Sequence, residues 1–283
     1  MPKSILVVDD NEDLRELVSS ALTQAGYDVF GAPNASEGLR IAAQQEPELV
    51  LLDIMMPGMD GLEMLARLRE RDKEMPVIVM TAHSTPETVI SAMREQACDF
   101  LAKPFDMDDL VSAVNAVFAI APQEIAIKVL SARPEWVELR VPCSMAAIDP
   151  LERLITQLEM DIPPTTRDNI TYAFREMLRN AIEYGGKNDP TKFVEVGYLH
   201  SPRVIIYRIK DPGEGFSIEA LRHAAILNPE GDPVRHERVR EELGMRPGGF
   251  GILIARNMVD EMIYNERHNE VLLIKYLDDE PAS

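Results

Sequence analysis

Acidic, hydroxyl and amino side chains follow the apolar runs of the N-terminal half at positions suited to phosphoryl chemistry. Asp9 and Asp10 follow ILVV, Asp53 ends LVLLD, Thr81 ends VIVMT, and Lys103 follows FLA. If these runs are parallel strands, their carboxyl ends share the sheet edge at which ligands bind. Three carboxylates converging there would repel each other, so a divalent cation with oxygen ligands, magnesium first, is the expected occupant. Lys103 offers a positive charge to a phosphoryl oxygen.

A second set of polar residues lies in the segment FREMLRNAIEYGG, which begins at Phe174 and carries two stripes at helical spacing. Phe174 and Leu178 belong to an apolar stripe that a helix needs for docking on a core. Glu176, Asn180 and Glu183 line the helix about half a turn away. This polar stripe either is solvated or holds a metal ion and a nucleotide.

Two glycine-rich segments follow in the C-terminal half. KDPGEGF comes after the apolar run RVIIYRI, and its glycines permit positive φ and close backbone approach. RPGGFG precedes an amphipathic segment, so it would open a helix whose free amide groups suit phosphate oxygens. Each glycine-rich segment alone is weak evidence for a nucleotide site. The evidence becomes stronger because the polar helix stripe, KDPGEGF and RPGGFG follow one another in this order along the chain. The residues concerned are Asp211, Gly213, Gly215, Gly248, Gly249 and Gly251.

Strands and helices that alternate along the chain must position the acidic residues, Thr81 and Lys103 of the N-terminal half. From Ser4 to Phe118, short apolar runs alternate with amphipathic stretches. This alternation predicts a doubly wound α/β domain, residues 1–121, with five parallel strands and helices on both faces. A linker, residues 122–134, follows. Its helical pattern from Glu124 to Leu130 either extends the preceding helix past a kink or makes a separate turn.

Residues 135–283 have a different pattern. VELRVP is followed by two helices (145–160 and 169–184), by the hairpin strands FVEVGYL and RVIIYRIKD, and by a charged interval whose RHERVREEL is interpreted as a helical lid. A helix from GGFG to Met262 and the strand EVLLIKYL close the chain. Helices gathered against an antiparallel or mixed sheet predict a two-layer α+β domain.

Charge and composition exclude several classes of partner. The 283 residues include 48 Asp and Glu against 29 Lys and Arg, a formal net charge of -19. Such a field repels nucleic acid and anionic membrane surfaces, so neither is expected as a partner. No apolar run approaches the roughly 20 residues that span a bilayer, and no signal-peptide pattern is seen, which predicts a cytoplasmic protein. Cys98 and Cys143, far apart, predict reduced and buried or half-buried thiols.

The motifs VVDDN, LLDIMMPGMDG, VMTA and KP closely resemble the receiver domain of bacterial response regulators, in order and in spacing. The resemblance implies a flavodoxin-like fold with Asp53 as phosphoacceptor, Thr81 and Lys103 as its catalytic partners, and a sensor histidine kinase as phosphodonor. Thr81 and Phe100 would form the switch pair that reports phosphorylation. The resemblance also implies that Asp10 binds Mg²⁺ directly and that Asp9 assists it. The other implied ligands are Asp53 and the main-chain oxygen of Met55.

The helix with Glu176 and Asn180, D-x-G-x-G after a strand and GGFG before a helix together resemble the GHKL ATP-binding fold. Histidine kinases, gyrase-type ATPases and certain serine kinases share this fold. The resemblance implies that Asn180 coordinates magnesium, that Asp211 binds the adenine amino group and that Glu176 is the candidate general base. Arg179 and Glu183 are expected to be solvated. Gly213 and Gly215 would shape the base pocket, and Gly248, Gly249 and Gly251 would lie against the phosphates under a mobile lid.

Within that fold, EMLRNAIEYG and the segment MVDEMIYNERHNEVLLIKYL are similar to anti-sigma factor serine kinases. The resemblance, from Trp136 to Leu277, implies an ATP-dependent serine/threonine protein kinase under receiver control. Its substrate in such a partner switch would be an anti-anti-sigma (STAS-type) protein. Capture of a sigma factor and formation of a homodimer are left open.

Two alternative functions are weighed against the kinase. A histidine kinase needs a phosphorylatable histidine on a long dimerising helix hairpin ahead of the ATP-binding domain, and none of the five histidines is so placed. His236, followed by Glu237, imitates such a site but falls in the lid segment. The second alternative is an ATP-binding module that sequesters a partner without chemistry. Glu176 favours the kinase over this module.

Overall fold

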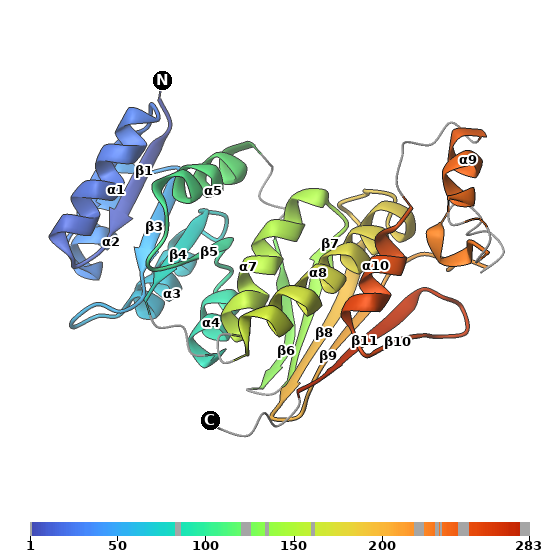
Figure 1. Cartoon of the computed structure of the whole chain (residues 1–283). Helices are drawn as coiled ribbons and strands as arrows, with labels where there is room; N and C mark the ends of the chain where they lie inside the picture. The colour runs from blue at the N-terminus through green and yellow to red at the C-terminus, as the bar shows by residue number, and fades with distance from the viewer. Residues whose placement is uncertain are drawn as a thin grey trace. The chain divides into compact units, whose positions relative to one another are not determined.

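The computed structural model describes residues 2–82, 86–119, 126–133, 136–159, 162–217, 224–229, 232, 234–242 and 249–277. The chain divides into two compact units (Figure 1). The first comprises Met1–Val129 and Asp149–Met160, and the second comprises Leu130–Ile148 and Asp161–Ser283. Among the described residues, no helix combines the length and the apolar character that crossing a bilayer requires.

The first unit is built on a five-stranded parallel sheet, as predicted. Its strands are β1 (Ser4–Val8), β2 (Asp28–Ala32), β3 (Leu49–Asp53), β4 (Val77–Thr81) and β5 (Asp99–Ala102), in the order β2-β1-β3-β4-β5. The apolar residues of the central strands β1, β3 and β4 are almost all fully buried. Continuous apolar runs suit such strands because helices cover both faces of the sheet.

Five helices complete this layer structure: α1 (Glu12–Gln24), α2 (Ala35–Gln45), α3 (Gly61–Arg71), α4 (Pro86–Arg94) and α5 (Met107–Ala119). Helix α1 packs against α5, while α3 packs against both α2 and α4. Side chains of Asn11, Asn34 and Asp60 accept the backbone N–H groups three residues on and so cap α1, α2 and α3. These caps start each helix close to a strand end, which fixes the loops that carry polar residues.

Helix α7 (Ile148–Leu158), preceded by the 3₁₀ turn Met145–Ala147, also packs in the first unit from Asp149 onward. Its Arg153 donates from Nε to Oδ1 of Asp99 at 2.7 Å, and a second guanidinium nitrogen binds the other oxygen of the same carboxylate. Asp99 is the first residue of β5 and is 1% exposed. Burial raises the pKa of Asp99, and the bond from Arg153 opposes that rise. The bidentate pair therefore fixes α7 to the strand that carries Phe100.

The second unit holds a six-stranded sheet in the order β10-β11-β9-β8-β7-β6. The strands are β6 (Lys128–Arg133), β7 (Trp136–Pro142), β8 (Phe193–Ser201), β9 (Val204–Lys210), β10 (Glu261–Tyr264) and β11 (Glu270–Tyr276). Neighbours from β7 through β8, β9 and β11 to β10 pair antiparallel. The predicted α+β class and the β8–β9 hairpin are confirmed.

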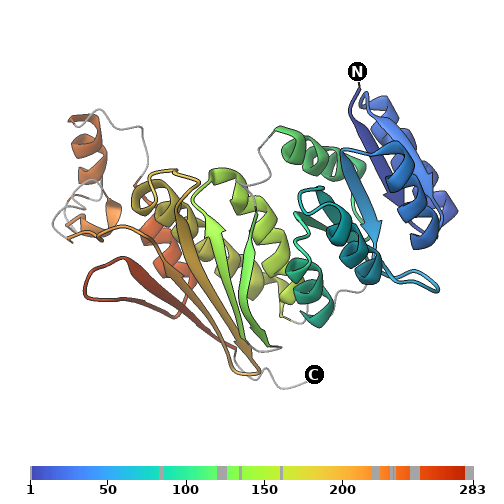
Figure 2. The same ribbon diagram turned by 180° about the vertical axis from the view of Figure 1, so that it is seen from behind.

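The helices of this unit are α8 (Pro164–Asn180), which continues as a π-helical turn Ala181–Gly185, α9 (Arg235–Glu242) and α10 (Gly251–Met258), with a 3₁₀ turn Ala225–Leu227. Helices α8 and α10 pack together and lie over one face of the sheet (Figure 1). The opposite face, turned to the viewer in Figure 2, has no described helix of this unit over it. Phe174 of α8 packs on Tyr207 of β9 with ring centroids 4.6 Å apart.

Two expectations about local structure are wrong. The helical pattern from Glu124 to Leu130 ends in a strand, because β6 begins at Lys128; residues 121–125 lie outside the described part. The helix expected to reach Met262 stops at Met258, since Val259 has extended backbone with φ -116° and ψ 161°. The chain then enters edge strand β10.

The expectation for the cysteines is confirmed: Cys98 is half-buried and Cys143 is buried, both as free thiols. Burial raises the pKa of Cys98 to about 12 and that of Cys143 to about 11. Both side chains are therefore protonated, unreactive thiols at neutral pH.

The Arg153–Asp99 pair yields a stability prediction. Arg153→Met leaves a buried carboxylate without its cation, which should lower the free energy of unfolding of the first unit by about 3 kcal/mol at neutral pH. Removing Arg153 takes away its hydrogen bond and its charge, the two largest effects that oppose burial at Asp99, so the folded-state pKa of Asp99 lies further above the unfolded value. The penalty is therefore full above that raised pKa and shrinks as the pH falls and Asp99 takes up a proton.

Urea denaturation followed by circular dichroism, at pH 7 and near pH 5, measures this effect. The double variant Asp99→Asn/Arg153→Met should regain most of the lost stability at pH 7, because no buried charge is left. A single variant with the wild-type urea midpoint at pH 7 would show that the pair does not stabilise the unit.

Candidate functional site

The first candidate site lies at the carboxyl ends of β1 and β3, where the sequence predicted it. One carboxylate oxygen from each of Asp9, Asp10 and Asp53 lies within 4.8 Å of the others. Asp9 is fully buried, Asp53 is 4% exposed, and Asp10 is open to solvent. Two buried carboxylates and one accessible carboxylate, all offering oxygen, fit a hard divalent cation such as Mg²⁺ that enters from solvent.

Lys103 joins two of these acids. Its Nζ lies 2.7 Å from Oδ2 of Asp9 and 2.7 Å from Oδ2 of Asp53. The other oxygen of Asp53 accepts the backbone N–H of Met55 at 3.0 Å. Burial raises the pKa of Asp53, while the hydrogen bonds from Lys103 and Met55 oppose the rise. A Cβ on Gly61 would come within 2.2 Å of the carbonyl oxygen of Asp53, so the α3 start can approach this strand end only as glycine.

The two expected switch residues lie on neighbouring strands. Thr81 ends β4 with 2% exposure, and Phe100 in β5 is 3% exposed. The carbonyl oxygen of Thr81 accepts the backbone N–H of Lys103 at 2.8 Å, which keeps the two strand ends adjacent. Within the described residues, the Thr81 hydroxyl is buried without a hydrogen-bond partner. A phosphoryl oxygen on Asp53 would supply the missing partner, so the site fits this group.

The second candidate site is a cavity of about 840 Å³ in the second unit, within the size range of small-molecule and cofactor sites. It brings together residues from α8, from the loop after β9 and from the start of α10. The predicted residues that line it are Glu176, Asn180, Asp211, Gly213, Gly215, Gly249 and Gly251. Gly248 lies outside the described residues.

One end of the cavity is shaped by Asp211. Its Oδ1 accepts the backbone N–H of Gly213 at 2.7 Å, and burial raises the pKa of the carboxyl group. A Cβ on Gly185 would lie 2.3 Å from that oxygen, and a Cβ on Gly213 would lie 2.7 Å from it. Gly215 has φ +84°, and its Cβ would lie 1.7 Å from the carbonyl oxygen of Arg267. Only glycine satisfies these contacts, so the D-x-G-x-G spacing has a steric cause.

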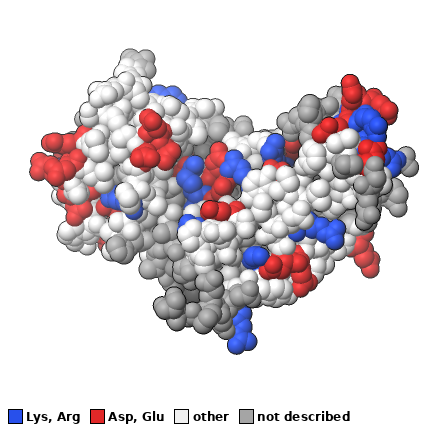
Figure 3. Space-filling view, in the orientation of Figure 1, with Lys and Arg blue, Asp and Glu red and all other residues white. Residues whose placement is uncertain are grey.

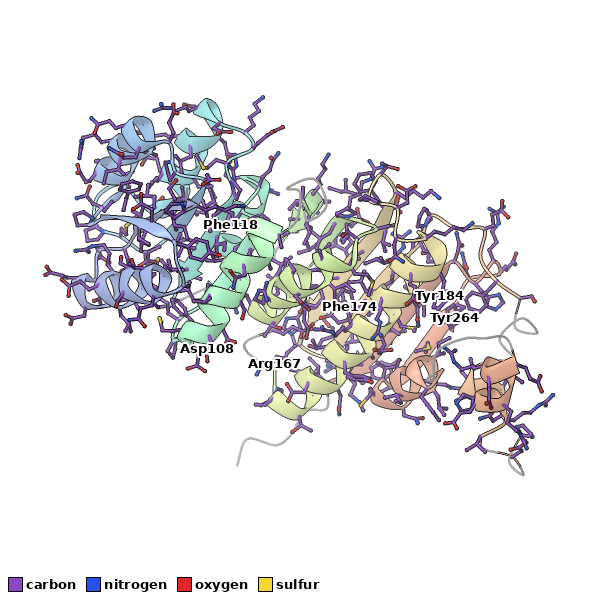
Figure 4. The ribbon with its side chains drawn as sticks, turned by 90° about the horizontal axis from the view of Figure 1, so that it is seen from above. Asp108, Phe118, Arg167, Phe174, Tyr184 and Tyr264 are labelled. Atoms are coloured by element: carbon purple, nitrogen blue, oxygen red, sulfur yellow. The ribbon has the colours of Figure 1, made fainter. Side chains whose placement is uncertain are left out.

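Aromatic side chains that the sequence did not identify also line this end. Phe216, Tyr264 and His268 pack together with ring centroids 5.2 to 5.8 Å apart. Figure 4 labels Tyr264 of β10 and Tyr184, which follows α8; both line the cavity. Burial raises the pKa of Tyr264 to about 12. Since β10 was not predicted, no local signal placed Tyr264 beside the glycine loop.

The other end contains Glu176. Arg179 Nη1 donates to Oε1 of Glu176 at 3.3 Å, and the Glu176 side chain is 18% exposed. The position of a Cβ on Gly251 lies 2.4 Å from Oε2, so this glycine admits the carboxylate to the start of α10. Arg179 and Glu183, which we expected to be solvated, also line the cavity, and the Arg179 side chain is 40% exposed. The amide of Asn180 and these acids could hold the magnesium ion of a nucleotide.

Comparison with known proteins assigns both units. Residues 5–115 match the family described as "Response regulator receiver domain", and residues 142–275 match "Histidine kinase-like ATPase domain". The second match thus includes α7, whose residues from Asp149 pack in the first unit.

Several curated relatives match part of the chain. Sporulation initiation phosphotransferase F of Bacillus subtilis is 39% identical over 115 residues, which are 41% of this chain and 93% of that protein. The DNA-binding transcriptional regulator NtrC of Escherichia coli K12 is 42% identical over 111 residues, 39% of this chain and 24% of that protein. Regulatory protein AtoC of E. coli K12 is 27% identical over 204 residues, 71% of this chain and 44% of that protein.

The chain therefore spans from about a quarter to less than half of the length of NtrC and AtoC. The structure of the Vibrio cholerae chemotaxis protein CheY4 is 29% identical, with a TM-score of 0.40, and covers 41% of this chain and 99% of that one. Given the receiver match, the acids and Lys103 gathered at the sheet edge and the relative matched over almost its full length, the chain belongs to the response regulator family and joins a receiver domain to a histidine kinase-like ATPase domain.

Proposed function

We propose that the protein is an ATP-dependent serine/threonine protein kinase of the anti-sigma factor type, controlled by phosphorylation of Asp53 in its receiver domain. The observation that carries this proposal is the cavity of about 840 Å³ that joins Glu176, Asn180 and Asp211 to the two glycine loops. A sensor histidine kinase donates the phosphoryl group to Asp53. An anti-anti-sigma protein of the STAS type is the substrate of the kinase, and a sigma factor is a second candidate partner.

At the receiver site, an oxygen of Asp53 forms a bond to phosphorus while the bond between phosphorus and the donor breaks. Lys103, 2.7 Å from Asp53, binds a phosphoryl oxygen, and the buried Thr81 hydroxyl donates to another. Asp9, Asp10, Asp53 and the main-chain oxygen of Met55 are the proposed Mg²⁺ ligands. Held by these groups, Mg²⁺ would neutralise charge between the acids and the incoming phosphoryl group.

At the ATPase site, Asp211 binds the adenine amino group, and Gly213 and Gly215 let the base approach the backbone. Asn180 holds the magnesium ion that accompanies ATP. Glu176 accepts the proton of a serine or threonine hydroxyl of the substrate. The hydroxyl oxygen forms a bond to the terminal phosphorus of ATP, the bond from that phosphorus to ADP breaks, and ADP leaves. Arg179, 3.3 Å from Glu176, orients the carboxylate. Gly249 and Gly251 leave room for the phosphates at the start of α10.

Control by the receiver would act through the Asp99–Arg153 contact and then along the polypeptide chain. Phe100, the proposed switch residue, follows Asp99 in β5, and Asp99 is bound to Arg153 of α7. Helix α7 leads along the chain into α8, which carries Glu176 and Asn180. A shift of β5 on phosphorylation would act on α7 and bias α8, provided that the two states differ in contact energy.

The histidine-kinase alternative needs an accessible histidine that accepts a phosphoryl group, and His236 is a poor candidate for that role. His236 is fully buried in α9, where a phosphoryl donor cannot reach it. The sequestration alternative shares the same cavity and differs only in lacking transfer, so a test of Glu176 separates the two. A cytoplasmic location belongs to the proposal, since two distant free thiols fit a reducing compartment.

The receiver assignment predicts labelling of Asp53. Acetyl phosphate with Mg²⁺ should phosphorylate the wild type at one base-labile site per chain, because Lys103 and the acids complete the transfer site. Asp53→Asn should stay folded by circular dichroism and remain unlabelled by mass spectrometry. Asp28→Asn, an exposed acid at the start of β2, is the matched control and should label normally. Equal labelling of the Asp53 variant would refute the assignment.

The kinase assignment predicts phosphoserine or phosphothreonine on the partner protein. Glu176→Gln should lower the rate of transfer by about 10²- to 10⁴-fold with ATP affinity retained, because the general base is lost. Asp168→Asn, an exposed acid on the same helix that does not line the cavity, is the control and should keep most activity. Transfer and ATP affinity are measured with radiolabelled ATP and by calorimetry. Acid-labile phosphohistidine on the chain, or transfer unaffected by Glu176→Gln, would contradict the mechanism.

A further inference from the structure

The loop after β9 is tied by a side chain to the turn that joins β10 to β11. Nδ2 of Asn269 donates to the carbonyl oxygen of Gly213 at 3.2 Å and to that of Asp211 at 3.5 Å. Asn269 is half-buried and lines the cavity. Its amide therefore holds the loop backbone on both sides of Pro212, which has no N–H of its own.

A second amide fixes the direction in which Asn269 donates. Oδ1 of Asn265 accepts the backbone N–H of Asn269 at 3.1 Å, and Nδ2 of Asn265 donates to Oδ1 of Asn269 at 2.9 Å. A backbone N–H can only donate, so the first bond sets the orientation of the Asn265 amide. The second bond then leaves Nδ2 of Asn269 for the two carbonyl oxygens of the loop. The backbone N–H of His268 donates to the carbonyl oxygen of Asn265 at 3.1 Å, which closes the turn.

The loop that Asn269 holds also orients the carboxylate of Asp211. Oδ1 of Asp211 accepts the backbone N–H of Gly213 at 2.7 Å, so a shift of this loop would turn or displace the carboxylate. The fold would survive loss of the Asn269 amide, because two backbone bonds also keep the loop on the hairpin. They run from the N–H of Asp211 to the carbonyl oxygen of Asn269 at 2.9 Å and from the N–H of Phe216 to that of Arg267 at 3.2 Å.

Recognition of a base in this cavity depends on individually placed polar groups. On the face drawn in Figure 3, acidic and basic side chains of the second unit lie interspersed with uncharged surface. An uncharged base gains little from such a mixed surface, and a few well-placed polar groups must set its orientation. Adenine offers an amino group where guanine offers a carbonyl oxygen. An ionised carboxylate accepts a hydrogen bond from the amino group and repels the oxygen, so the direction of Asp211 decides which base is bound.

We propose that Asn269 positions Asp211 for adenine, so that the turn between β10 and β11 sets the base selectivity of the nucleotide site. This inference rests on the proposed ATP site and assigns its selectivity to a side chain outside the D-x-G-x-G motif. Asn269 acts through Asp211 and need not touch the base itself. The phosphate end of the site, at Asn180 and the start of α10, does not depend on this amide.

Calorimetry on the full chain with Mg²⁺ tests the proposal, using non-hydrolysable analogues of ATP and GTP. The wild type should bind the ATP analogue more tightly. Asn269→Ala should weaken binding of the ATP analogue by on the order of tenfold to a hundredfold, because the hydrogen bond between the carboxylate and the amino group is lost. Binding of the GTP analogue should change by less than about threefold, since guanine never makes that bond. Asn257→Ala, an exposed asparagine of α10 outside the cavity wall, is the control and should leave both affinities unchanged.

The pair of asparagines supplies a second test. Asn265→Ala should weaken binding of the ATP analogue less than Asn269→Ala, because the donating amide stays and only its orienting partner is lost. The double variant should bind no more weakly than Asn269→Ala alone, since both changes act through the same bonds. Asn269→Asp keeps the size of the side chain but replaces the donating N–H with an acceptor oxygen, so it should bind at least as weakly as Asn269→Ala.

A measurement on the wild type keeps the test independent of how well the variants fold. Hydrogen exchange should show stronger protection of the backbone amides of Asp211, Gly213 and Asn269 with the ATP analogue than with inorganic triphosphate, because the base stabilises the loop that positions Asp211.

Four results would overturn the role of Asn269 while leaving the ATP site intact. They are equal weakening of both analogues by Asn269→Ala, no weakening at all, a double variant whose losses add, and equal protection with the ATP analogue and inorganic triphosphate. A wild type that binds both analogues equally well would overturn it too. A wild type that binds neither analogue would instead overturn the proposed function itself.

Discussion

Helix α8 packs one stripe of side chains on the sheet and presents another to the cavity, and the organisation of the ATPase domain follows from this double constraint. Phe174 and Leu178 are fully buried, and Phe174 packs on Tyr207 of the sheet. Because this apolar stripe fixes the rotation of the helix, Glu176 and Asn180 are directed into the cavity rather than to solvent. Displacing the core stripe would turn the polar stripe away from Asp211 and the glycine loops. Stability and chemistry are thus encoded on the same helix.

The receiver sheet and most of the ATPase elements could be predicted because their signals are local. The five apolar runs are continuous since their strands are covered on both faces. The D-x-G-x-G spacing is visible because the contacts of Gly213 and Gly215 exclude any Cβ. Strand β10 was missed for the opposite reason: it is a four-residue, half-exposed edge strand whose sequence also continues the helical pattern of α10. Strand β6, likewise at an edge, has the same ambiguity.

Other features of the candidate site depend on tertiary structure and have no local signal. Tyr264 and His268 reach the cavity only because the β10–β11 hairpin folds back beside Gly215. The sequence left the polar stripe of α8 open between solvent and a nucleotide, and only the fold shows that Arg179 and Glu183 line the cavity. The pairing of Arg153 with Asp99, 54 residues earlier, was equally invisible. That pair gives α7 its position next to β5.

We propose that phosphorylation of Asp53 sets the rate at which the ATPase domain transfers phosphate to its partner. The most direct measurement compares partner phosphorylation by the full-length protein with and without beryllofluoride, which mimics the phosphoryl group on Asp53. We expect beryllofluoride to change the rate by about tenfold or more, equivalent to about 1.4 kcal/mol of coupling, and we expect this change to disappear in Asp53→Asn. Equal rates with and without beryllofluoride, from protein shown to bind it, would contradict receiver control of the kinase.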